Sequence, residues 1–540
     1  MNQAVNSATN TVVILGGGLA GSTLARQVKL MYPSLEIKII ESNSFPVPLA
    51  KFKVGESTVD IAGHYLRNVL GLEAHLEQEQ LPKYGLRFFL PAGDNKDITQ
   101  RVEVGNCKRP ASKSYQLDRG KFENFMHALL LEQGVDFIDS ARVTDIQIGN
   151  ASHIVTYSKP DGSQHDINAH WVLDASGGAR LLQKALKLPA RHTKSHYSAW
   201  FRVVGKVEVN ALSSDSQWLN QVPEVARQLC TNHLVGKGYW VWIIPLSGNN
   251  TSIGVVVDPE LHDVAQLNTL ESTQQWLQAH EPQLAHYLQK QSYEVMDYKT
   301  MGNFTYRCDT VFSPQRWALT GISGSFTDPF YSPGTDFIAI ANTLICKLIG
   351  EDLAGNDLTE PCKASEQMYF AGYDSLISTV ENQYGIFAHN LAMSCKLLWD
   401  GTLAWSGAGV MFCNDRFTNS KVAMQVSDEL MLMGKLHTTM QQVFRRWSKE
   451  LPDRELRKDI IVDRRDNFGQ RAQRALVTPH SDEELVAQVK QNFNTLCSLA
   501  AALFRLIENK SIIDSEVALL VSGYQHESEV DTELNELLFG

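Results

Sequence analysis

Three glycines near the start of the chain have the spacing of a site that holds a dinucleotide. Gly16, Gly18 and Gly21 follow an apolar run of strand length and precede a helix-like segment. The first glycine allows a tight turn, the second lets the backbone approach a pyrophosphate, and the third lets the helix pack closely against the strand. Backbone N–H groups at the start of the helix, at Leu19 and Ala20, would face the phosphates.

An acidic residue completes this pattern at the expected distance. Glu41 ends a second apolar run and lies 20 residues beyond Gly21, where a carboxylate can accept hydrogen bonds from ribose hydroxyls. A glycine motif alone is weak evidence, and an ordinary glycine-rich turn is the alternative. With strand, helix and acid in register, however, the pattern predicts a dinucleotide site. These residues leave the choice between FAD and NAD open.

Other candidate functional residues lie further along the chain. Residues 81–90 predict a strand that is entered through a proline, and Lys83 stands at its start, where a lysine is usually just solvated. Trp240 and Trp242 share one face of a predicted strand, and such a pair usually belongs to the core. Arg119 follows Asp118, a plausible helix cap, so it lies either on the surface or against an anionic cofactor.

The composition describes a large folded protein and excludes several classes of partner. The chain has 540 residues, 43% of them hydrophobic and 20% charged, which suggests two or three subdomains. A net charge of −11 without a long basic run argues against nucleic acid. No apolar stretch reaches the ~20 residues that a membrane span needs.

The cysteines and the first residues of the chain indicate a cytoplasmic protein. The eight cysteines include no C-x-x-C pair, so we expect reduced thiols and neither a disulfide framework nor a metal site. The ten residues before the first predicted strand lack the basic, apolar and small-residue pattern of a signal peptide.

Periodicity predicts a mixed α/β protein with four segments. We expect a Rossmann-like nucleotide-binding domain over 1–190, with a return segment over 311–355 that brings a glycine-rich turn and a second helix start to the ligand. Alternating apolar residues predict a β-rich substrate subdomain over 191–310. Helical periodicity dominates the C-terminal region over 356–540.

Four motifs together resemble those of the flavin-dependent halogenases, the tryptophan-halogenase-like branch of the FAD monooxygenases. They are Gly16–Gly21 with Glu41, the loop Lys53-Val54-Gly55-Glu56-Ser57-Thr58, Lys83 in a Pro-Lys-x-Gly-x-Arg-Phe-Phe context, and Trp240-x-Trp242-x-Ile244-Pro245. The last matches the W-x-W-x-I-P signature of the family in full and is the most specific. The resemblance covers roughly residues 10–350. Ser57 or Thr58 is also a candidate cap for the helix that follows the loop.

This resemblance implies an FAD enzyme of the aromatic hydroxylase and halogenase fold, present as a monomer or homodimer. FAD would be reduced by a separate flavin reductase, and reduced flavin, O₂ and chloride or bromide would give a hypohalous acid. Lys83 matches the lysine that passes the halogen to an electron-rich aromatic ring, by hydrogen bonding or as a haloamine. Trp240 and Trp242 match the residues that disfavour direct oxygenation of the substrate. The residues implied as FAD contacts are the glycine fingerprint with Glu41, together with Lys53, Val54, Gly55, Glu56, Arg119, Asp328 and Gly334.

The loop after Asp328 departs from the tryptophan halogenases. Those enzymes carry Glu-Ser-Thr-Gly where this chain has Tyr-Ser-Pro-Gly over 331–334, so Tyr331 replaces the glutamate that helps to activate indole. This favours a substrate that is already activated, such as a phenol or pyrrole, free or on a carrier protein. The proline of this loop has no N–H, which leaves Gly334 and Thr335 as the candidate halide donors.

Two other functions remain open at this stage. A monooxygenase that hydroxylates a phenolic, indolic or peptidyl aromatic would use the same flavin chemistry, and Tyr331 and Pro333 favour it. A flavin-binding protein without oxygenation chemistry would leave Lys83 and the two tryptophans unexplained. Ile322 replaces the aspartate that reaches the ribityl chain in hydroxylases, so FAD would be held more loosely.

Overall fold

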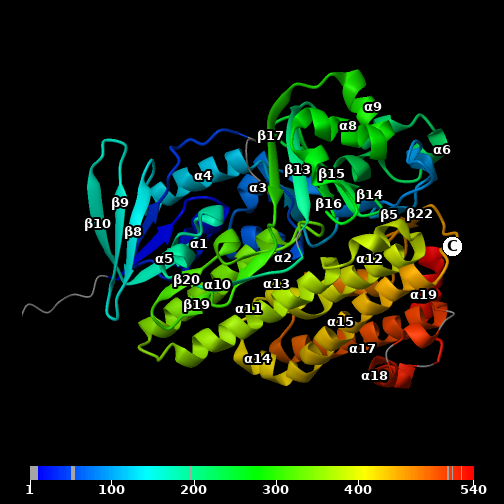
Figure 1. Ribbon diagram of the computed structural model, residues 1–540. Coiled ribbons are helices and arrows are strands. Elements are labelled where there is room, and N and C mark those ends of the chain that lie inside the picture. Colours follow the sequence, from blue (N-terminus) through cyan, green and yellow to red (C-terminus); the bar gives the residue numbers. More distant parts are fainter. Residues whose placement is uncertain (1–9, 50–54, 195, 508–509, 514, 525) are drawn as a thin grey trace, which may run out of the picture.

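A six-stranded sheet carries the glycine fingerprint at its centre (Figure 1). In the computed structural model, which describes residues 10–49, 55–194, 196–507, 510–513, 515–524 and 526–540, β1 (Thr11–Leu15) pairs in parallel with β2 (Glu36–Ile40) and β11 (Trp171–Asp174). All five residues of β1 are buried, as expected for a parallel strand covered on both faces. The sheet is completed by β20 (Trp317–Leu319), β19 (Phe312–Ser313) and β7 (Asp136–Ile138).

The turn after β1 leaves no room for side chains at two of its glycines. Gly16 has a φ of +104°, and a Cβ at Gly21 would lie 1.9 Å from the carbonyl oxygen of Gly16. Helix α1 (Leu19–Met31) therefore begins directly against the end of β1 and contacts α4 (Arg119–Glu132) and α10 (Gly334–Leu353).

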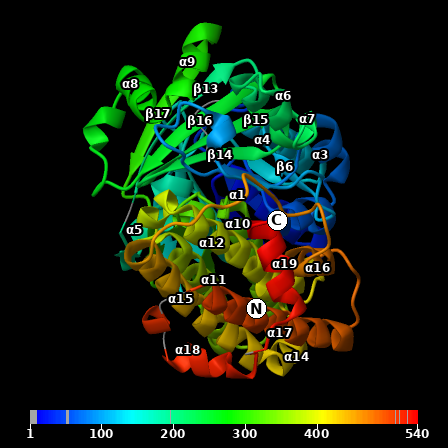
Figure 2. The same ribbon diagram turned by 90° about the vertical axis from the view of Figure 1, so that its right-hand side faces the viewer.

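An eight-stranded sheet forms the second layer of the molecule (Figure 2). Its order is β17-β13-β16-β15-β14-β4-β5-β22, so it contains more than the segment predicted to be β-rich. The predicted strand over 81–90 is interrupted at Gly85, whose φ is +102°, and only its second half joins this sheet. The C-terminal region, predicted to be helical, supplies the edge strand β22, which pairs with β5 and covers the backbone groups of its outer edge. The strands are β4 (Leu86–Phe89), β5 (Glu103–Gly105), β13 (Tyr197–Val204), β14 (Thr231–Gly236), β15 (Tyr239–Leu246), β16 (Asn250–Val257), β17 (Val295–Gly302) and β22 (Asp459–Ile461).

Three smaller sheets and a set of short helices connect these layers. The small sheets contain β3 (Leu81–Lys83) and β6 (Ser114–Gln116); β8 (Arg142–Ile148), β9 (His153–Ser158) and β10 (Gln164–Ala169); and β12 (Ala190–His192), β18 (Tyr306–Cys308) and β21 (Ser325–Phe326). The shorter helices are α2 (Asp60–His64), α3 (Glu73–Glu79), α5 (Leu181–Ala185), α6 (Ser216–Leu219), α7 (Glu224–Gln228), α8 (Leu270–His280), α9 (Pro282–Gln291), α13 (Val410–Cys413), α14 (Ser420–Gln425), α16 (Phe468–Ala475), α18 (Ser515–Leu520) and α19 (Glu529–Leu538).

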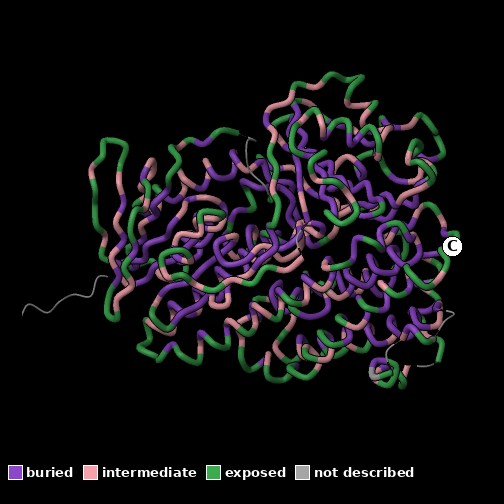
Figure 3. The backbone as a smooth tube through the Cα atoms, in the orientation of Figure 1, coloured by how far each residue is buried: buried purple, intermediate pink, exposed green. Residues whose placement is uncertain are grey.

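Long helices from the C-terminal part of the chain pack below both sheets (Figures 1 and 2). They are α11 (Thr359–Val380), α12 (Asn390–Ala404), α15 (Ser427–Glu450) and α17 (Asp482–Leu506). The buried side chains of α12, α15 and α17 share one hydrophobic cluster with Trp240 and Trp242, so these helices pack against the tryptophan face of the eight-stranded sheet, whereas Cys362 and Tyr369 of α11 belong to the cluster of the six-stranded sheet. Buried residues are concentrated in the interior between the helices and the sheets (Figure 3). Among the described residues, no helix is long and apolar enough to cross a membrane. The four-segment division at 190, 310 and 355 stays a prediction.

Substitution of Gly21 by alanine tests the close approach of α1 to β1. The added Cβ would overlap the Gly16 carbonyl, so we expect a loss of about 1–3 kcal/mol in the free energy of unfolding, with weaker FAD binding. Denaturant unfolding and flavin fluorescence measure the two effects. Gly178→Ala is the matched control, because a Cβ there would meet no atom within 4 Å. Equal stability of the two variants would contradict the packing described here.

Candidate active site

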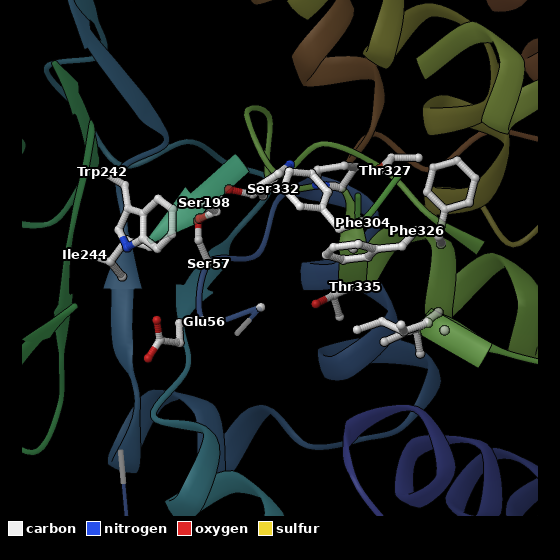
Figure 4. Close-up of a pocket in the computed structure, with 18 of the residues that line it drawn as sticks. Glu56, Ser57, Ser198, Trp242, Ile244, Phe304, Phe326, Thr327, Ser332 and Thr335 are labelled. Carbon is white, nitrogen blue, oxygen red and sulfur yellow. Dashed lines mark hydrogen bonds between the residues drawn. The ribbon is translucent and has the colours of Figure 1, made fainter. Parts of the chain in front are cut away.

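A largely apolar cavity lies between the eight-stranded sheet and the start of α10 (Figure 4). Trp240 and Trp242 on β15 line it from the sheet side. Phe304, Phe326 and Thr335 lie on the opposite side of the open space. Leu19, from the first turn of α1, also lines the cavity, so the cavity extends to the glycine fingerprint. Residues predicted from widely separated motifs are therefore brought together at one site.

The amine of Lys83 is fully buried next to this cavity and is held by oxygen atoms. Its Nζ donates to Ser57 Oγ at 2.7 Å and to the Thr58 carbonyl oxygen at 2.6 Å. Ser57 Oγ is 2.8 Å from Thr231 Oγ1 and accepts from Ser332 Oγ at 2.9 Å. Ser57, Thr231 and Ser332 all line the cavity, so hydroxyl groups connect the amine to it.

Burial changes the charge that Lys83 carries. Desolvation lowers the pKa of this amine to about 7, although Cys230, Asp60 and Asp336 act in the opposite direction. Burial also raises the pKa of Asp336 to about 8. Among the described residues, no carboxylate forms an ion pair with Lys83. Near neutral pH a substantial fraction of Lys83 is therefore the neutral amine, which can act as a nucleophile.

The loop before α2 does not cap that helix. We predicted a cap from Ser57 or Thr58, but the residue before α2 is Val59, which makes no cap hydrogen bond, and Asp336 Oδ1 accepts from the Ala62 N–H of the first turn at 2.8 Å. Thr58 Oγ1 instead donates to the Tyr115 carbonyl oxygen, and Ser57 is occupied by Lys83. This expectation was wrong because both hydroxyls bond elsewhere: Ser57 accepts from Lys83 of β3, and Thr58 donates to Tyr115 of β6.

The glycine fingerprint has the geometry that the ADP part of a dinucleotide needs. A Cβ at Gly18 would meet its nearest atom, Glu123 Oε1, only at 3.8 Å, so the space over this residue is open. Glu41 Oε2 accepts from the Gly17 N–H at 2.7 Å, and Oε1 accepts from the Asn43 N–H at 2.7 Å. Because each carboxylate oxygen has two lone pairs, Oε2 retains one for a ribose hydroxyl.

Three further predicted cofactor contacts surround one end of the cavity. Gly55, Glu56 and Arg119 all line it. Gly55 has a φ of +78°, and a Cβ there would lie 3.2 Å from the Arg119 guanidinium. Glu56 Oε1 accepts from Arg202 Nε at 2.7 Å, which fixes the carboxylate. Arg119 donates to Glu123 at 2.6 Å. Lys53 and Val54 lie outside the described residues, and the cofactor roles of all these residues stay predictions.

The first turn of α10 faces the cavity and is a candidate anion site. Pro333, Gly334 and Thr335 line the cavity, and no side chain caps this turn. Thr335 Oγ1 is buried and has no hydrogen-bond partner among the described residues. A Cβ at Gly334 would meet no atom within 4 Å. N–H groups at a helix start favour an anion, so Gly334 and Thr335 remain the candidates for halide.

The carboxylate of Asp328 is held by residues outside the cavity. Its Oδ2 accepts from Tyr384 Oη at 2.7 Å and lies 2.8 Å from His196 Nδ1. Its Oδ1 accepts from the Phe330 N–H at 3.0 Å. These bonds tie the cavity loop to the segment before α12, and Asp328 is not among the lining residues. Any contact of Asp328 with the cofactor therefore stays a prediction.

Tyr331 is anchored to a second buried lysine in the helical region. Its hydroxyl donates to Asp400 Oδ2 at 2.6 Å, and Lys396 Nζ donates to the same oxygen at 2.5 Å. Gln441 accepts from Lys396 at 2.6 Å and donates to Asp400 Oδ1 at 2.6 Å. Burial and the Asp400 carboxylate raise the pKa of Tyr331 well above its ordinary value. Thus Tyr331 is a neutral hydrogen-bond donor, and its correspondence to the tryptophan-type glutamate stays a prediction.

Sequence reasoning missed several polar residues of the site. Thr231 and His233 occupy alternate positions on β14, and both line the cavity. The polar threonine and histidine at alternate positions of the segment predicted to be β-rich were the available signal. Lys396 and Asp400 are four residues apart on α12, but nothing in their local sequence indicates that Tyr331 is their partner.

The family described as tryptophan halogenase matches residues 11–90 and 75–360, which is well over half of the chain. The chain belongs to the tryptophan halogenase family. It is 27% identical over 388 residues to the flavin-dependent halogenase chlA of Dictyostelium discoideum, covering 66% of this chain and 63% of that protein. It is 25% identical over 357 residues to a 1H-pyrrole-2-carbonyl-[peptidyl-carrier protein] brominase of Pseudoalteromonas luteoviolacea, covering 65% of this chain and 79% of that protein. The chain thus spans less than two thirds of the length of the Dictyostelium relative.

Solved structures show the same fold. Halogenase PltM in complex with phloroglucinol and FAD superposes with a TM-score of 0.65 at 14% identity, covering 98% of this chain and 99% of that one. The flavin-dependent brominase Bmp2 gives a TM-score of 0.57 at 19% identity, covering 81% and 98%. The family and the mixed α/β fold predicted from the sequence are confirmed, and the likeness to PltM extends through the C-terminal helices.

The two buried lysines should respond differently to removal of the amine. Lys396→Met leaves the Asp400 carboxylate buried without its cation, so we expect a loss of about 3–5 kcal/mol in the free energy of unfolding. Lys83→Met removes no ion pair and should cost much less. Urea unfolding of both variants measures this. A larger loss for Lys83→Met would show that Lys83, not Lys396, is the structural lysine.

Proposed function

We propose that this protein is an FAD-dependent halogenase that places chlorine or bromine on an electron-rich aromatic ring. The observation that carries this proposal is the buried amine of Lys83, held next to a cavity that Trp240, Trp242 and Leu19 of the glycine fingerprint line. The names of the relatives support it, because they describe flavin-dependent halogenases. When reduced FAD is bound, it supplies with O₂ the oxidising equivalent that turns halide into hypohalous acid.

Each part of the chain has a distinct task in this reaction. The turn from Gly16 to Gly21, with Glu41, would hold the ADP part of FAD, and Arg119 and Glu56 would contact the cofactor nearer the cavity. The open first turn of α10, with Gly334 and Thr335, would bind halide. A separate flavin reductase would deliver reduced FAD.

Lys83 would receive the halogen at Nζ. Two N–H bonds of this nitrogen point to Ser57 Oγ and to the Thr58 carbonyl oxygen. The remaining direction is occupied by a third N–H bond in the ammonium form and by the lone pair in the neutral amine. Because burial without an ion pair favours the neutral form, the lone pair would take the halogen and pass it on as a haloamine. The apolar walls would exclude water, which would otherwise carry the oxidant away.

The proposed substrate is a phenol or a pyrrole, either free or tethered to a carrier protein. Tyr331 is held neutral by burial and by Asp400, so no carboxylate at this position activates a less reactive ring. The pyrrole-carbonyl carrier-protein brominase and chlorinase among the relatives support the tethered form.

A reconstituted reaction tests the function. The protein is supplied with FAD, a flavin reductase, NADH, O₂ and bromide or chloride, and small phenols are offered with a monochlorodimedone-like trap. We expect halogenated phenol from the unchanged protein and none from Lys83→Met, which should still bind FAD. Hydroxylated product that forms without halide would replace this proposal with a monooxygenase.

The pH dependence of halogen transfer tests the charge of Lys83. The pKa of about 7 means that Nζ is protonated below neutral pH and loses its proton above it. If the lone pair takes the halogen, product formation per turnover should fall as the pH is lowered through about 7. Product yield from pH 5.5 to 8.5, normalised to reduced flavin consumed, measures this. A yield that rises on acidification would instead assign the transfer to the ammonium group as a hydrogen-bond donor.

A further inference from the structure

One nitrogen in the cavity wall has no use in the reaction as described so far. His233 lies on β14 opposite Trp242 on β15, and its side chain is completely buried yet lines the cavity. Its Nε2 has no hydrogen-bond partner among the described residues. A buried acceptor without a partner costs free energy, so its presence in the cavity wall needs a reason.

The other ring nitrogen determines the tautomer of His233. Nδ1 is 3.2 Å from the carbonyl oxygen of Arg87, and a carbonyl oxygen can only accept. Nδ1 therefore carries the hydrogen, and Nε2 presents a lone pair. Burial, together with a smaller effect of the nearby Lys83, lowers the pKa of this imidazole to about 3. His233 is consequently a neutral acceptor throughout the physiological range.

Aromatic rings fix the position of this lone pair. The imidazole stacks on Phe88 with a centroid distance of 4.6 Å, and Trp240 and Phe330 lie at 5.2 and 5.7 Å. The faces of these three rings carry no N–H or O–H group, so they cannot donate a conventional hydrogen bond to Nε2. A donor must therefore come from a small molecule inside the cavity.

His233 shares a strand face with the first of the hydroxyl groups that lead to Lys83. His233 and Thr231 are two residues apart on one strand, so their side chains share a face and their Cα atoms lie about 6–7 Å apart. Thr231 Oγ1 is 2.8 Å from Ser57 Oγ, which accepts from Lys83. A molecule of two or three atoms can thus bond to His233 and reach the region of Lys83.

We propose that His233 Nε2 binds hypohalous acid by accepting the hydrogen bond of its O–H group, and so retains the oxidant in the cavity until Lys83 takes the halogen. This inference rests on the proposed halogenase function. Hypohalous acids have one O–H donor and an electrophilic halogen, so a bond to the hydrogen leaves the halogen free. An imidazole this weakly basic accepts the hydrogen bond without removing the proton, and removal would give the far less electrophilic hypohalite.

The transfer step balances without a change at His233. A bond forms between Lys83 Nζ and the halogen while the bond between halogen and oxygen breaks. The oxygen takes one proton from Nζ and leaves as water. His233 gains and loses no proton, so its role is to bind and orient the oxidant.

Two substitutions separate the acceptor from the ring. His233→Phe keeps a flat ring on Phe88 but removes the acceptor, whereas His233→Gln places an amide oxygen near the position of Nε2. The reaction contains reduced FAD, O₂, bromide and phenol, with monochlorodimedone as a trap for escaping oxidant. For His233→Phe we expect the ratio of trapped to phenol-bound bromine to rise about three- to tenfold, as for the loss of one hydrogen bond. O₂ consumption should not change, and His233→Gln should recover most of the retention.

His75→Phe is the matched control. His75 also stacks on a phenylalanine, Phe125, with a centroid distance of 3.9 Å, and burial lowers its pKa to about 4. It does not line the cavity, so this variant should retain bromine as the unchanged protein does. Equal retention by His233→Phe, His233→Gln and the unchanged protein would overturn the proposal and leave only a bound water at Nε2.

A measurement without cofactor or halide keeps this test separate from the proposed function. ¹⁵N NMR of histidine-labelled protein, assigned with His233→Gln, should show a neutral imidazole with its hydrogen on Nδ1 from pH 8 to pH 5. Titration of His233 near its ordinary pKa, or a hydrogen on Nε2, would overturn the binding role even if the protein halogenates phenol. Absence of any halogenation by the unchanged protein, with the expected NMR result, would contradict the function and with it the assignment of hypohalous acid as the ligand.

Discussion

The desolvation of one amine is the constraint on which the site depends. Lys83 is completely buried without an ion pair among the described residues, and its Nζ is held by a hydroxyl and a carbonyl oxygen. Neutral acceptors hold the nitrogen in place but do little to stabilise its charge, so burial lowers its pKa to about 7. A carboxylate in the position of Ser57 would fix the same geometry and keep the amine protonated. The choice of oxygen atoms around Lys83 therefore sets its chemistry.

Ser57 shows how the fold maintains this arrangement. Its Oγ contacts Lys83 from β3, Thr231 from β14 and Ser332 from the loop before α10. One hydroxyl with two lone pairs and one hydrogen can satisfy all three contacts. The nucleotide-binding part, the eight-stranded sheet and the return segment thus meet at a single atom, and a shift of any one of them would change the position of the amine.

Local sequence patterns predicted the parts of this protein that depend on local geometry. The turn at Gly16 and Gly21 is such a part, because only a missing Cβ permits the approach of α1 to β1. The pairing of Trp240 with Trp242 on one strand face also follows from strand periodicity. The family resemblance supplied Lys83, which composition alone would have placed in solvent. The amine's neutral partners and its pKa needed the structure, because Thr231 and Ser332 are far from Lys83 in sequence.

Two strand pairings that were not predicted involve partners that are distant in the chain. The predicted strand over 81–90 is divided at Gly85 so that one half pairs with β6 and the other with β14. The C-terminal region is helical as predicted, but its short strand β22 pairs with the edge of β5. Neither segment carries a local sequence signal for these pairings. The strand with which an edge strand pairs depends on which other strand lies beside it in the folded chain, and that strand is distant in the sequence.

The helical region that packs on the cavity loop fixes the side chain of Tyr331. Asp400 reaches the hydroxyl of Tyr331 from α12, and Lys396 already neutralises this carboxylate. A glutamate at 331 would bring a second buried carboxylate towards Asp400 with only one cation for both, and two such groups cannot both remain ionised. The Tyr331 hydroxyl, the Asp400 carboxylate and the Lys396 amine are thus coupled, and a neutral donor at 331 fits this arrangement. An acid could be accommodated there only together with a change at Asp400, so the residue that this loop can carry at 331 depends on the C-terminal helices as well as on the loop itself.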